Sequence, residues 1–209
     1  MSRKTDPFHI ELTADLVLRA YPAGIFPMAE DADSTDVFWV SPEQRGILPL
    51  DSFHVSRSLR KEMKQSSFSI RVDTNFMAVI EGCATAGTDR DSTWINPAIR
   101  KIYGQLFARG LCHTVEVWDG DSLVGGLYGL SIGAAFFGES MFHRATNASK
   151  MALVHLVDRL NAGGYRLLDT QFVTPHLATF GGIEIPREDY ELRLAAALQH
   201  DADFFALDG

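Results

Sequence analysis

The chain has 209 residues, of which 46% are hydrophobic, so it can bury the core of one large domain with a small appendage. It carries 19 basic and 27 acidic residues, and the resulting net charge of −8 repels phosphate at long range, which excludes a protein whose whole surface attracts nucleic acid. No apolar segment is long enough to span a membrane, and the N-terminus lacks the apolar core of a signal peptide. We therefore expect a soluble, cytoplasmic protein that does not bind membranes.

The charges are distributed unevenly along the chain. From residue 184 to the C-terminus, seven acids face two arginines, a local charge of −5. Between His54 and Arg71, five basic residues face the single acid Glu62, a local charge of +4. A basic patch on an acidic protein can still contact a nucleic acid locally, although most such patches are solvated helix surfaces. The basic residues are Arg57, Arg60, Lys61, Lys64 and Arg71.

The first 45 residues are expected to form a small N-terminal domain. A polar segment, residues 1–8, precedes a predicted helix over 12–21 and a short predicted strand over 38–40. A connection that contains Pro, Gly and Arg, residues 41–49, marks the expected boundary, so residues 46–209 form the second domain.

The second domain alternates helical and strand patterns, which indicates an α+β fold. Asp119-Gly120 predicts a hairpin between two of its strands, and polar loops are expected over 85–92 and 174–186. This order suits a mixed sheet of the acetyltransferase-like kind without being unique to it. Strands are predicted over 68–72, 113–118, 122–130 and 165–172, and helices over 56–64, 75–84, 97–109, 147–161 and 187–199.

One stretch, Gly125–Phe142, is almost wholly apolar or glycine and contains a single carboxylate, Glu139. Its two halves are predicted to be buried strands that meet at a turn near 131–133. An ionised side chain in such a strand is costly unless it is paired or faces a polar pocket. Glu139 is therefore a candidate functional residue, the alternative being a strand-end glutamate that reaches solvent.

A second acid, Asp169, lies in the predicted strand over 165–172 and is followed by Gln171. Residues i and i+2 of a strand share a face, so these two side chains should project together. With Glu139 they form a candidate site of two carboxylates and an amide, for which Trp94, Phe136 and Met141 are apolar companions. Such a site suits binding a cation and handling its proton. Because the sequence indicates no nucleophile, cofactor or metal, the electrophile must arrive already activated.

Three common chemistries are disfavoured by the sequence. Residues 129–133 match the G-x-S-x-G elbow of serine hydrolases, but that motif needs a strand-to-helix turn and residues 134–138 read as a second strand. The seven histidines show no metal-ligand spacing. Residues 143–146 lack the glycine-rich turn that an acyl-CoA enzyme needs for pyrophosphate. The two cysteines, Cys83 and Cys112, read as buried thiols. We therefore expect no cofactor and no metal.

Six motifs, in the expected order, resemble the leucyl/phenylalanyl-tRNA–protein transferase family, and the match covers the chain from Tyr21 to Leu194. The resemblance implies a small N-terminal domain and an acetyltransferase-like (GNAT-like) mixed-sheet domain. The motifs are Gly24-Ile25-Phe26-Pro27, His54-Val55-Ser56-Arg57-Ser58, Thr93-Trp94-Ile95, Gly138-Glu139-Ser140-Met141-Phe142, Asn147-Ala148-Ser149-Lys150 and Leu168-Asp169-Thr170-Gln171.

The resemblance also implies an activity. Leucine or phenylalanine, and methionine less well, would pass from aminoacyl-tRNA to the N-terminal Arg or Lys of a protein by direct aminolysis of the ester, marking that protein for degradation. Gln171, supported by Asp169, would act at the α-amine, and Glu139 with Asp169 would bind the basic side chain. The enzyme would act as a monomer. The aminoacyl pocket would contain Trp94, Phe136 and Met141, and the tRNA acceptor end would lie on Arg57, Arg60, Lys61 and Lys64.

Two further functions differ in what they require. A non-catalytic binder of basic N-termini, an N-degron adaptor, would keep the acidic pocket without needing the basic helix face or Gln171. A transferase that modifies N-terminal Asp or Glu would bring like charges together in an acidic pocket, which disfavours it.

Overall fold

The protein was analysed as a computed structural model, which describes residues 12–85 and 93–208. Its centre is a seven-stranded mixed sheet with the strand order β4-β5-β6-β7-β8-β3-β9. The pair β7–β8 is parallel and the other pairs are antiparallel. The strands are β3 (Gln44–Ile47), β4 (Ser69–Val72), β5 (Cys112–Asp119), β6 (Ser122–Ile132), β7 (Ala135–His143), β8 (Leu167–Gln171) and β9 (Ile183–Pro186).

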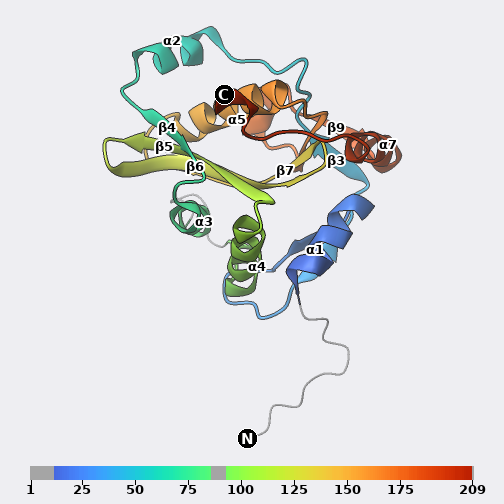
Figure 1. The fold of residues 1–209 in the computed structure, drawn as a ribbon. Coiled ribbons are helices and arrows are strands. Elements are labelled where there is room, and N and C mark those ends of the chain that lie inside the picture. Colours follow the sequence, from blue (N-terminus) through green and yellow to red (C-terminus); the bar gives the residue numbers. More distant parts are fainter. Residues whose placement is uncertain (1–11, 86–92, 209) are drawn as a thin grey trace, which may run out of the picture.

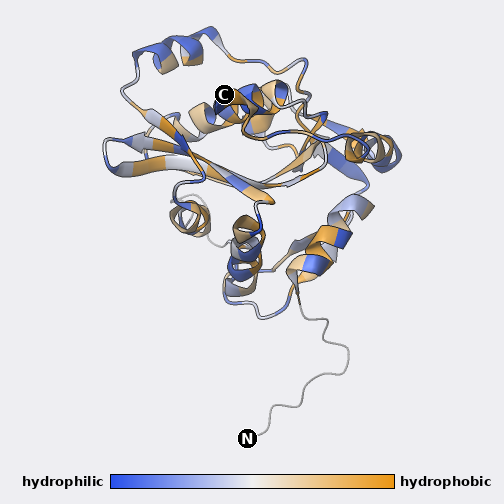
Figure 2. Ribbon diagram, in the orientation of Figure 1, coloured by the Kyte–Doolittle hydropathy of each residue, from blue (hydrophilic) through white to orange (hydrophobic). Residues whose placement is uncertain are grey.

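Helices cover both faces of this sheet (Figure 1). Helix α5 (Ala148–Ala162) lies on one face, and α3 (Phe76–Ala84) and α4 (Pro97–Ala108) lie on the other. Each face has its own hydrophobic cluster: the α5 cluster, and the cluster on the side of α3 and α4, which we call the α3–α4 cluster. Helix α2 (Arg57–Gln65) stands apart at the upper edge of the sheet and is largely hydrophilic (Figure 2).

The small N-terminal domain packs on the α3–α4 side. Helix α1 (Ala14–Ala20) begins at Thr13, whose hydroxyl accepts from the backbone N–H of Leu16, and runs into a 3₁₀ turn, η1 (Tyr21–Ala23). A two-stranded antiparallel sheet of β1 (Phe26–Met28) and β2 (Phe38–Val40) follows. The expected α+β class, with a small N-terminal domain and a mixed sheet, is confirmed.

The predicted helices and long strands are confirmed to within a few residues, including α7 (Arg187–Leu198). Several helices begin where the sequence places a capping side chain: Ser56, Asn75 and Asn96 each accept a hydrogen bond from the first turn. The predicted turn after Ser131 is also confirmed, because β6 and β7 form a hairpin there. No helix in the described ranges has the length and apolar character needed to cross a bilayer.

Two segments differ from the predictions. The connection predicted over 41–49 contains β3, which pairs with β8 and β9 in the large sheet, so the division at residue 45 falls within a strand. The loop predicted over 174–186 contains α6 (Pro175–Ala178) and β9. These strands have four residues each and gain their stability from partners far along the chain, which a local pattern does not reveal. The segment predicted over 1–8 and residues 86–92 of the loop predicted over 85–92 lie outside the described residues.

Strand β7 contains a bulge at Glu139. Gly129 of β6 lies opposite Gly138, whereas the preceding residue, Tyr128, lies opposite Ser140, so Glu139 is an extra residue on the β7 side. Bulges of this kind redirect side chains and occur often beside active sites. The bulge turns the Glu139 side chain toward the face of α4 and the N-terminal domain.

Candidate active site

Two buried tyrosines from separate elements hold the carboxylate of Glu139. The hydroxyl of Tyr21, from η1, donates to Glu139 Oε1 at 2.6 Å, and the hydroxyl of Tyr103, from α4, donates to Oε2 at 2.9 Å. The two hydroxyl oxygens are themselves 2.5 Å apart. Both tyrosines are fully buried, while Glu139 is half-buried. The carboxylate is therefore held by two buried hydroxyls, and Glu139 is not a strand-end residue directed into bulk solvent.

The surroundings of Glu139 change its protonation. Burial raises the pKa of Glu139 from 4.5 to about 7, although the hydrogen bonds from Tyr21 and Tyr103 oppose that rise. The charge of Asp169 raises this pKa further and that of Arg45 lowers it. Burial also raises the pKa of both tyrosines well above the usual range, so their hydroxyls keep their protons.

Asp169, on β8, is completely buried and its carboxylate is bound within the protein. Arg45, on β3, donates from Nε to Oδ1 at 2.9 Å and from Nη2 to Oδ2 at 2.6 Å, a bidentate ion pair. The hydroxyl of Tyr190 donates to Oδ2 at 2.7 Å, and the backbone N–H of Gln171 donates to Oδ1 at 2.8 Å. Each oxygen of Asp169 thus accepts two hydrogen bonds, which fills its ordinary capacity.

Arg45 was not identified from the sequence. Its guanidinium lies between the rings of Phe26 and Tyr190, 4.5 Å from each centroid, and Nη1 donates to the carbonyl of Gly24 at 2.9 Å. The side chain is 2% exposed. The only available signal was that a second buried acid, Asp169, needs a cationic partner, and the sequence did not indicate which base supplies it.

Gln171 ends strand β8 in an unusual conformation. Its φ of +58° lies in the left-handed region, which a residue with a side chain seldom adopts without support. The backbone bond to Asp169 supports it, and the side-chain Nε2 is a buried donor with no acceptor among the described residues. A strained residue with an unused buried donor points to a role toward a ligand.

The structure brings Glu139, Asp169 and Gln171 to one region. Strands β7 and β8 are neighbours, with Phe137 paired to Asp169, so Glu139 lies two residues beyond the last paired position. The contact between Asp169 and Gln171 is made by the backbone N–H of Gln171, and the left-handed φ of Gln171 departs from the regular strand geometry on which the predicted shared face rests.

The three residues assigned to an aminoacyl pocket are not all on one face. Trp94 is partly buried and packs against the α3–α4 cluster. Phe136 is fully buried and Met141 partly buried, and both belong with the α5 cluster on the opposite face. Phe136 and Met141 are five residues apart, so in a regular strand their side chains would point to opposite faces. They share a face because the bulge at Glu139 inserts one extra residue between them.

The four basic residues assigned to tRNA all lie exposed on α2 and the turn that begins it. Beside this helix is a cavity of about 270 Å³ whose lining includes Ser56, Ser58 and Lys150 as well as the acid Glu62. Glu62 accepts from the side chain of Asn147 at 2.7 Å, which fixes its position. The basic residues are Arg57, Arg60, Lys61 and Lys64.

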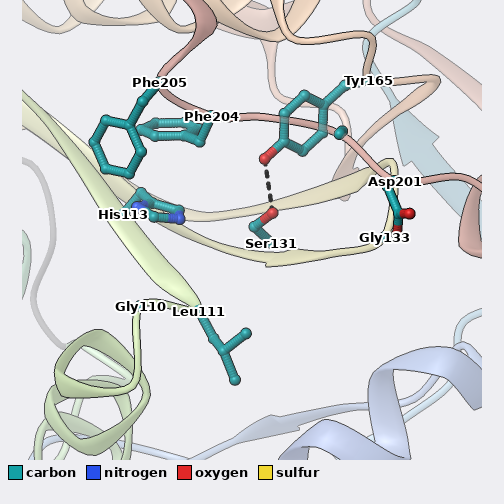
Figure 3. Close-up of a pocket in the computed structure, with 10 residues that line it drawn as sticks. Gly110, Leu111, His113, Ser131, Gly133, Tyr165, Asp201, Phe204 and Phe205 are labelled. Carbon is teal, nitrogen blue, oxygen red and sulfur yellow. Dashed lines mark hydrogen bonds between the residues drawn. The ribbon is translucent and has the colours of Figure 1, made fainter.

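A second cavity, of about 280 Å³, lies away from this site under the C-terminal segment (Figure 3). His113, Ser131, Tyr165 and Phe204 line it, and the hydroxyls of Ser131 and Tyr165 are 2.7 Å apart. Ser131 lies in a hairpin strand and not at a strand-to-helix turn, so the elbow geometry of a serine hydrolase is absent. Since this cavity contains neither acid nor amide of the candidate site, we treat it as separate.

Comparison with known proteins decides the family. The family model for leucyl/phenylalanyl-tRNA protein transferase matches residues 47–195, and the model for the N-terminal domain of the same transferase matches residues 10–43. The chain is 60% identical over 193 residues to the leucyl/phenylalanyl-tRNA–protein transferase of Paramagnetospirillum magneticum, covering 92% of each chain. The chain belongs to the leucyl/phenylalanyl-tRNA–protein transferase family. The family and enzyme class expected from the motifs are confirmed.

Two solved structures are distant neighbours of this family member. L-PGS from Bacillus licheniformis aligns with a TM-score of 0.45 and 7% identity, covering 75% of this chain and 65% of that one. The C-terminal domain of a putative lysylphosphatidylglycerol synthetase from Agrobacterium fabrum aligns with a TM-score of 0.49 and 10% identity, covering 88% and 69%. Likenesses at this level carry no argument about the function of the transferase.

Proposed function

We propose that this enzyme transfers leucine or phenylalanine, and methionine less well, from aminoacyl-tRNA to the α-amine of proteins that begin with Arg or Lys. The transfer is a direct aminolysis of the ester, and it directs the modified proteins to the N-degron degradation pathway. Family membership supports the aminoacyl-tRNA substrate. The observation that supports basic N-termini is the half-buried Glu139, whose carboxylate lies in a pocket of two tyrosines.

Glu139 and Asp169 have different parts in this proposal. All acceptor positions of Asp169 are filled by Arg45, Tyr190 and Gln171, so its carboxylate is not open to a substrate guanidinium or ammonium. Glu139 retains partial exposure and can accept from a basic side chain. We therefore assign Glu139 to binding that side chain, and Asp169 to positioning Gln171.

Gln171 acts at the reacting atoms. The α-amine, with a reference pKa of about 8, attacks the ester carbonyl carbon as the neutral amine. The carbon–nitrogen bond forms, the bond to the ribose oxygen breaks, and the amine proton ends on that oxygen. The Gln171 amide oxygen orients the amine, and Nε2 donates to the carbonyl oxygen as negative charge develops there.

The remaining contacts follow from the positions of the elements. Phe136 and Met141 contribute to the pocket for the transferred side chain from the α5 face, where unbranched Met adapts to either Leu or Phe. Trp94 packs with the cluster on the opposite face of the sheet, so we do not include it in this pocket. The basic face of α2 contacts the tRNA phosphates without reading sequence.

The test is transfer of radiolabelled leucine from leucyl-tRNA to peptides that begin with Arg or Asp. We expect transfer to the Arg peptide only, and Gln171→Ala should reduce kcat about 100-fold, as expected for loss of one donor to a developing charge. Thr170→Val is the matched control: Thr170 is the preceding residue and its hydroxyl is also buried without a partner among the described residues. The control should retain the activity of the wild type.

Two outcomes would overturn the proposal. If the wild type binds the Arg peptide but transfers no leucine, the protein is an N-degron adaptor. If leucine passes to the Asp peptide instead, the pocket at Glu139 selects the opposite charge and the assignment of that residue is wrong.

A further inference from the structure

Four oxygen atoms from three residues form a closed ring at the candidate site. Tyr21 Oη lies 2.6 Å from Glu139 Oε1, Tyr103 Oη lies 2.9 Å from Glu139 Oε2, and the two hydroxyl oxygens lie 2.5 Å apart. All three distances are within hydrogen-bond range. Each residue of the ring therefore contacts both of the others.

Three hydrogen bonds need three protons, and the two tyrosines supply only two. If Glu139 were ionised, both hydroxyl protons would point at the carboxylate, and the two hydroxyl oxygens would face each other at 2.5 Å through lone pairs alone. A proton on the carboxyl removes this conflict. One of the two tyrosine–glutamate bonds then reverses its direction: the carboxyl donates to that tyrosine, which donates to the other, which donates back to Glu139. The ring geometry fits a protonated carboxyl.

We propose that the empty site holds Glu139 as the neutral acid within this ring, and that a basic N-terminal side chain enters by displacing its proton to solvent. This inference rests on the proposed function, since it takes the substrate to be a protein that begins with Arg or Lys. The specificity for a basic first residue then comes from the exchange of one proton in the group formed by Glu139, Tyr21 and Tyr103.

The groups around the ring favour the neutral acid in the empty site. Asp169, on β8, adds a negative charge that opposes ionisation, and its partner Arg45, on β3, offsets part of it. Tyr128, on β6, stands with its edge toward Tyr103 at 5.5 Å between centroids, and its buried hydroxyl has no partner among the described residues. Apart from Arg45, which Asp169 already holds, no cation in the described ranges pairs with Glu139.

The exchange has a consequence for selection. A neutral N-terminal side chain brings no charge to compensate an ionised Glu139, so Glu139 keeps its proton. The hydrogen bonds of the ring are then already satisfied, and the neutral side chain gains no bond from it. A guanidinium brings a permanent charge and no proton to lose, since its pKa is above 12. Its binding therefore weakens about tenfold for each pH unit below the pKa of Glu139.

The test is calorimetry of peptide binding in buffers that differ in ionisation enthalpy, which counts the protons released. The ligand is a peptide whose first residue is arginine without its α-amino group, so the amine contributes no proton. With Glu139 titrating at about 7, we expect release of about 0.9 proton at pH 6 and less than about 0.1 at pH 8.5. No release at pH 6 would overturn the inference.

Two variants identify the source of the proton. Glu139→Gln mimics the neutral acid, since its amide can both donate and accept within the ring, so it should fold normally yet release no proton. Glu81→Gln is the matched control: Glu81 is an exposed glutamate on α3, paired with Arg100, and its loss should leave the release unchanged. Release that persists in Glu139→Gln would contradict the assignment.

An infrared measurement needs no ligand. The carbonyl band of a protonated carboxyl should be present in the empty enzyme at pH 6, disappear at pH 8.5 and be absent in Glu139→Gln. Its absence from the wild type at pH 6 would overturn the inference. Leucine transfer to the Arg peptide, measured on the same preparations, separates the two proposals. Transfer without the carbonyl band would contradict only the proton exchange. The band without transfer would contradict only the proposed function.

Discussion

A buried guanidinium joins three parts of the chain at the scale of single residues. Arg45 binds Asp169 in two places, stacks between Phe26 and Tyr190, and donates to the carbonyl of Gly24. Because this ion pair is fully desolvated, removing one partner leaves an uncompensated buried charge. The same contact fixes Asp169, and through it the backbone of Gln171.

Arg45→Met should therefore lower the free energy of unfolding by about 3 kcal/mol, the scale for breaking a buried pair. It should also lower kcat for transfer, because Gln171 loses its support. Arg100→Met is the control: Arg100 pairs with Glu81 at the surface, and exposed pairs contribute about 0–1 kcal/mol. Urea denaturation measures the free energy of unfolding of the two variants. Equal losses in both would show that the buried Arg45–Asp169 pair contributes no more to stability than an exposed pair.

The pKa of Glu139 predicts how stability depends on pH. An unfolded glutamate ionises at about 4.3, and the folded one at about 7, so the native state holds one more proton between these values. The wild type should thus lose stability relative to Glu139→Gln as the pH rises across that window, and the difference should be constant above it. Denaturant midpoints at several pH values check this; a difference that does not change with pH would mean that folding leaves the pKa unaltered.

At the scale of elements, α2 carries the exposed basic side chains that we propose contact tRNA. Its one buried residue is Leu59, and its basic side chains are exposed, so replacing them should change stability little.

Replacing Lys61 and Lys64 by Ala together should raise KM for leucyl-tRNA about tenfold and leave KM for the Arg peptide unchanged. The logarithm of tRNA affinity should also depend less steeply on the logarithm of salt concentration, by about 0.7–0.9 for each phosphate that the variant no longer neutralises. Arg193→Ala, an exposed arginine on α7, is the matched control. If the control raises KM equally, the effect is general charge and α2 is not the tRNA site.

At the scale of the whole molecule, the N-terminal domain completes the site. Tyr21 and Gly24 come from η1 and its end, and they reach Glu139 on β7 and Arg45 on β3. The contacts that hold Glu139 and Arg45 in place therefore form completely only when the small domain packs on the sheet.

Tyr21→Phe should raise KM for the Arg peptide about tenfold. The variant lacks the hydroxyl by which the N-terminal domain contacts Glu139 of the large sheet. Tyr165→Phe is the matched control, since it removes a buried tyrosine hydroxyl that bonds to Ser131 in the separate cavity. Each variant should lose about 1 kcal/mol of stability for one hydrogen bond. A rise in KM in both variants would attribute the effect to general destabilisation.

The separation of these groups along the chain explains what the sequence could and could not predict. Helices and long strands follow from local periodicity and caps, and Glu139, Asp169 and Gln171 stood out as polar residues in apolar strands. Their partners did not. Tyr21 is 118 residues from Glu139 and 82 from Tyr103, and Arg45 is 124 from Asp169. Each partner reads locally as ordinary core or linker, and only the folded topology brings it to the site.

The single extra residue at Glu139 also changes which side chains of β7 face each side of the sheet. Before it, odd-numbered Phe137 packs with the α3–α4 cluster; after it, even-numbered Phe142 does so, and its ring lies against Gly82 of α3. Deleting the neighbouring Ser140 would close the bulge and leave Met141 and Phe142 opposite Leu127 and Gly126, on the sides that they now occupy. Glu139 would then pair with Tyr128 in a regular ladder, so the extra residue sets the direction of the Glu139 carboxylate and not the packing of the strand.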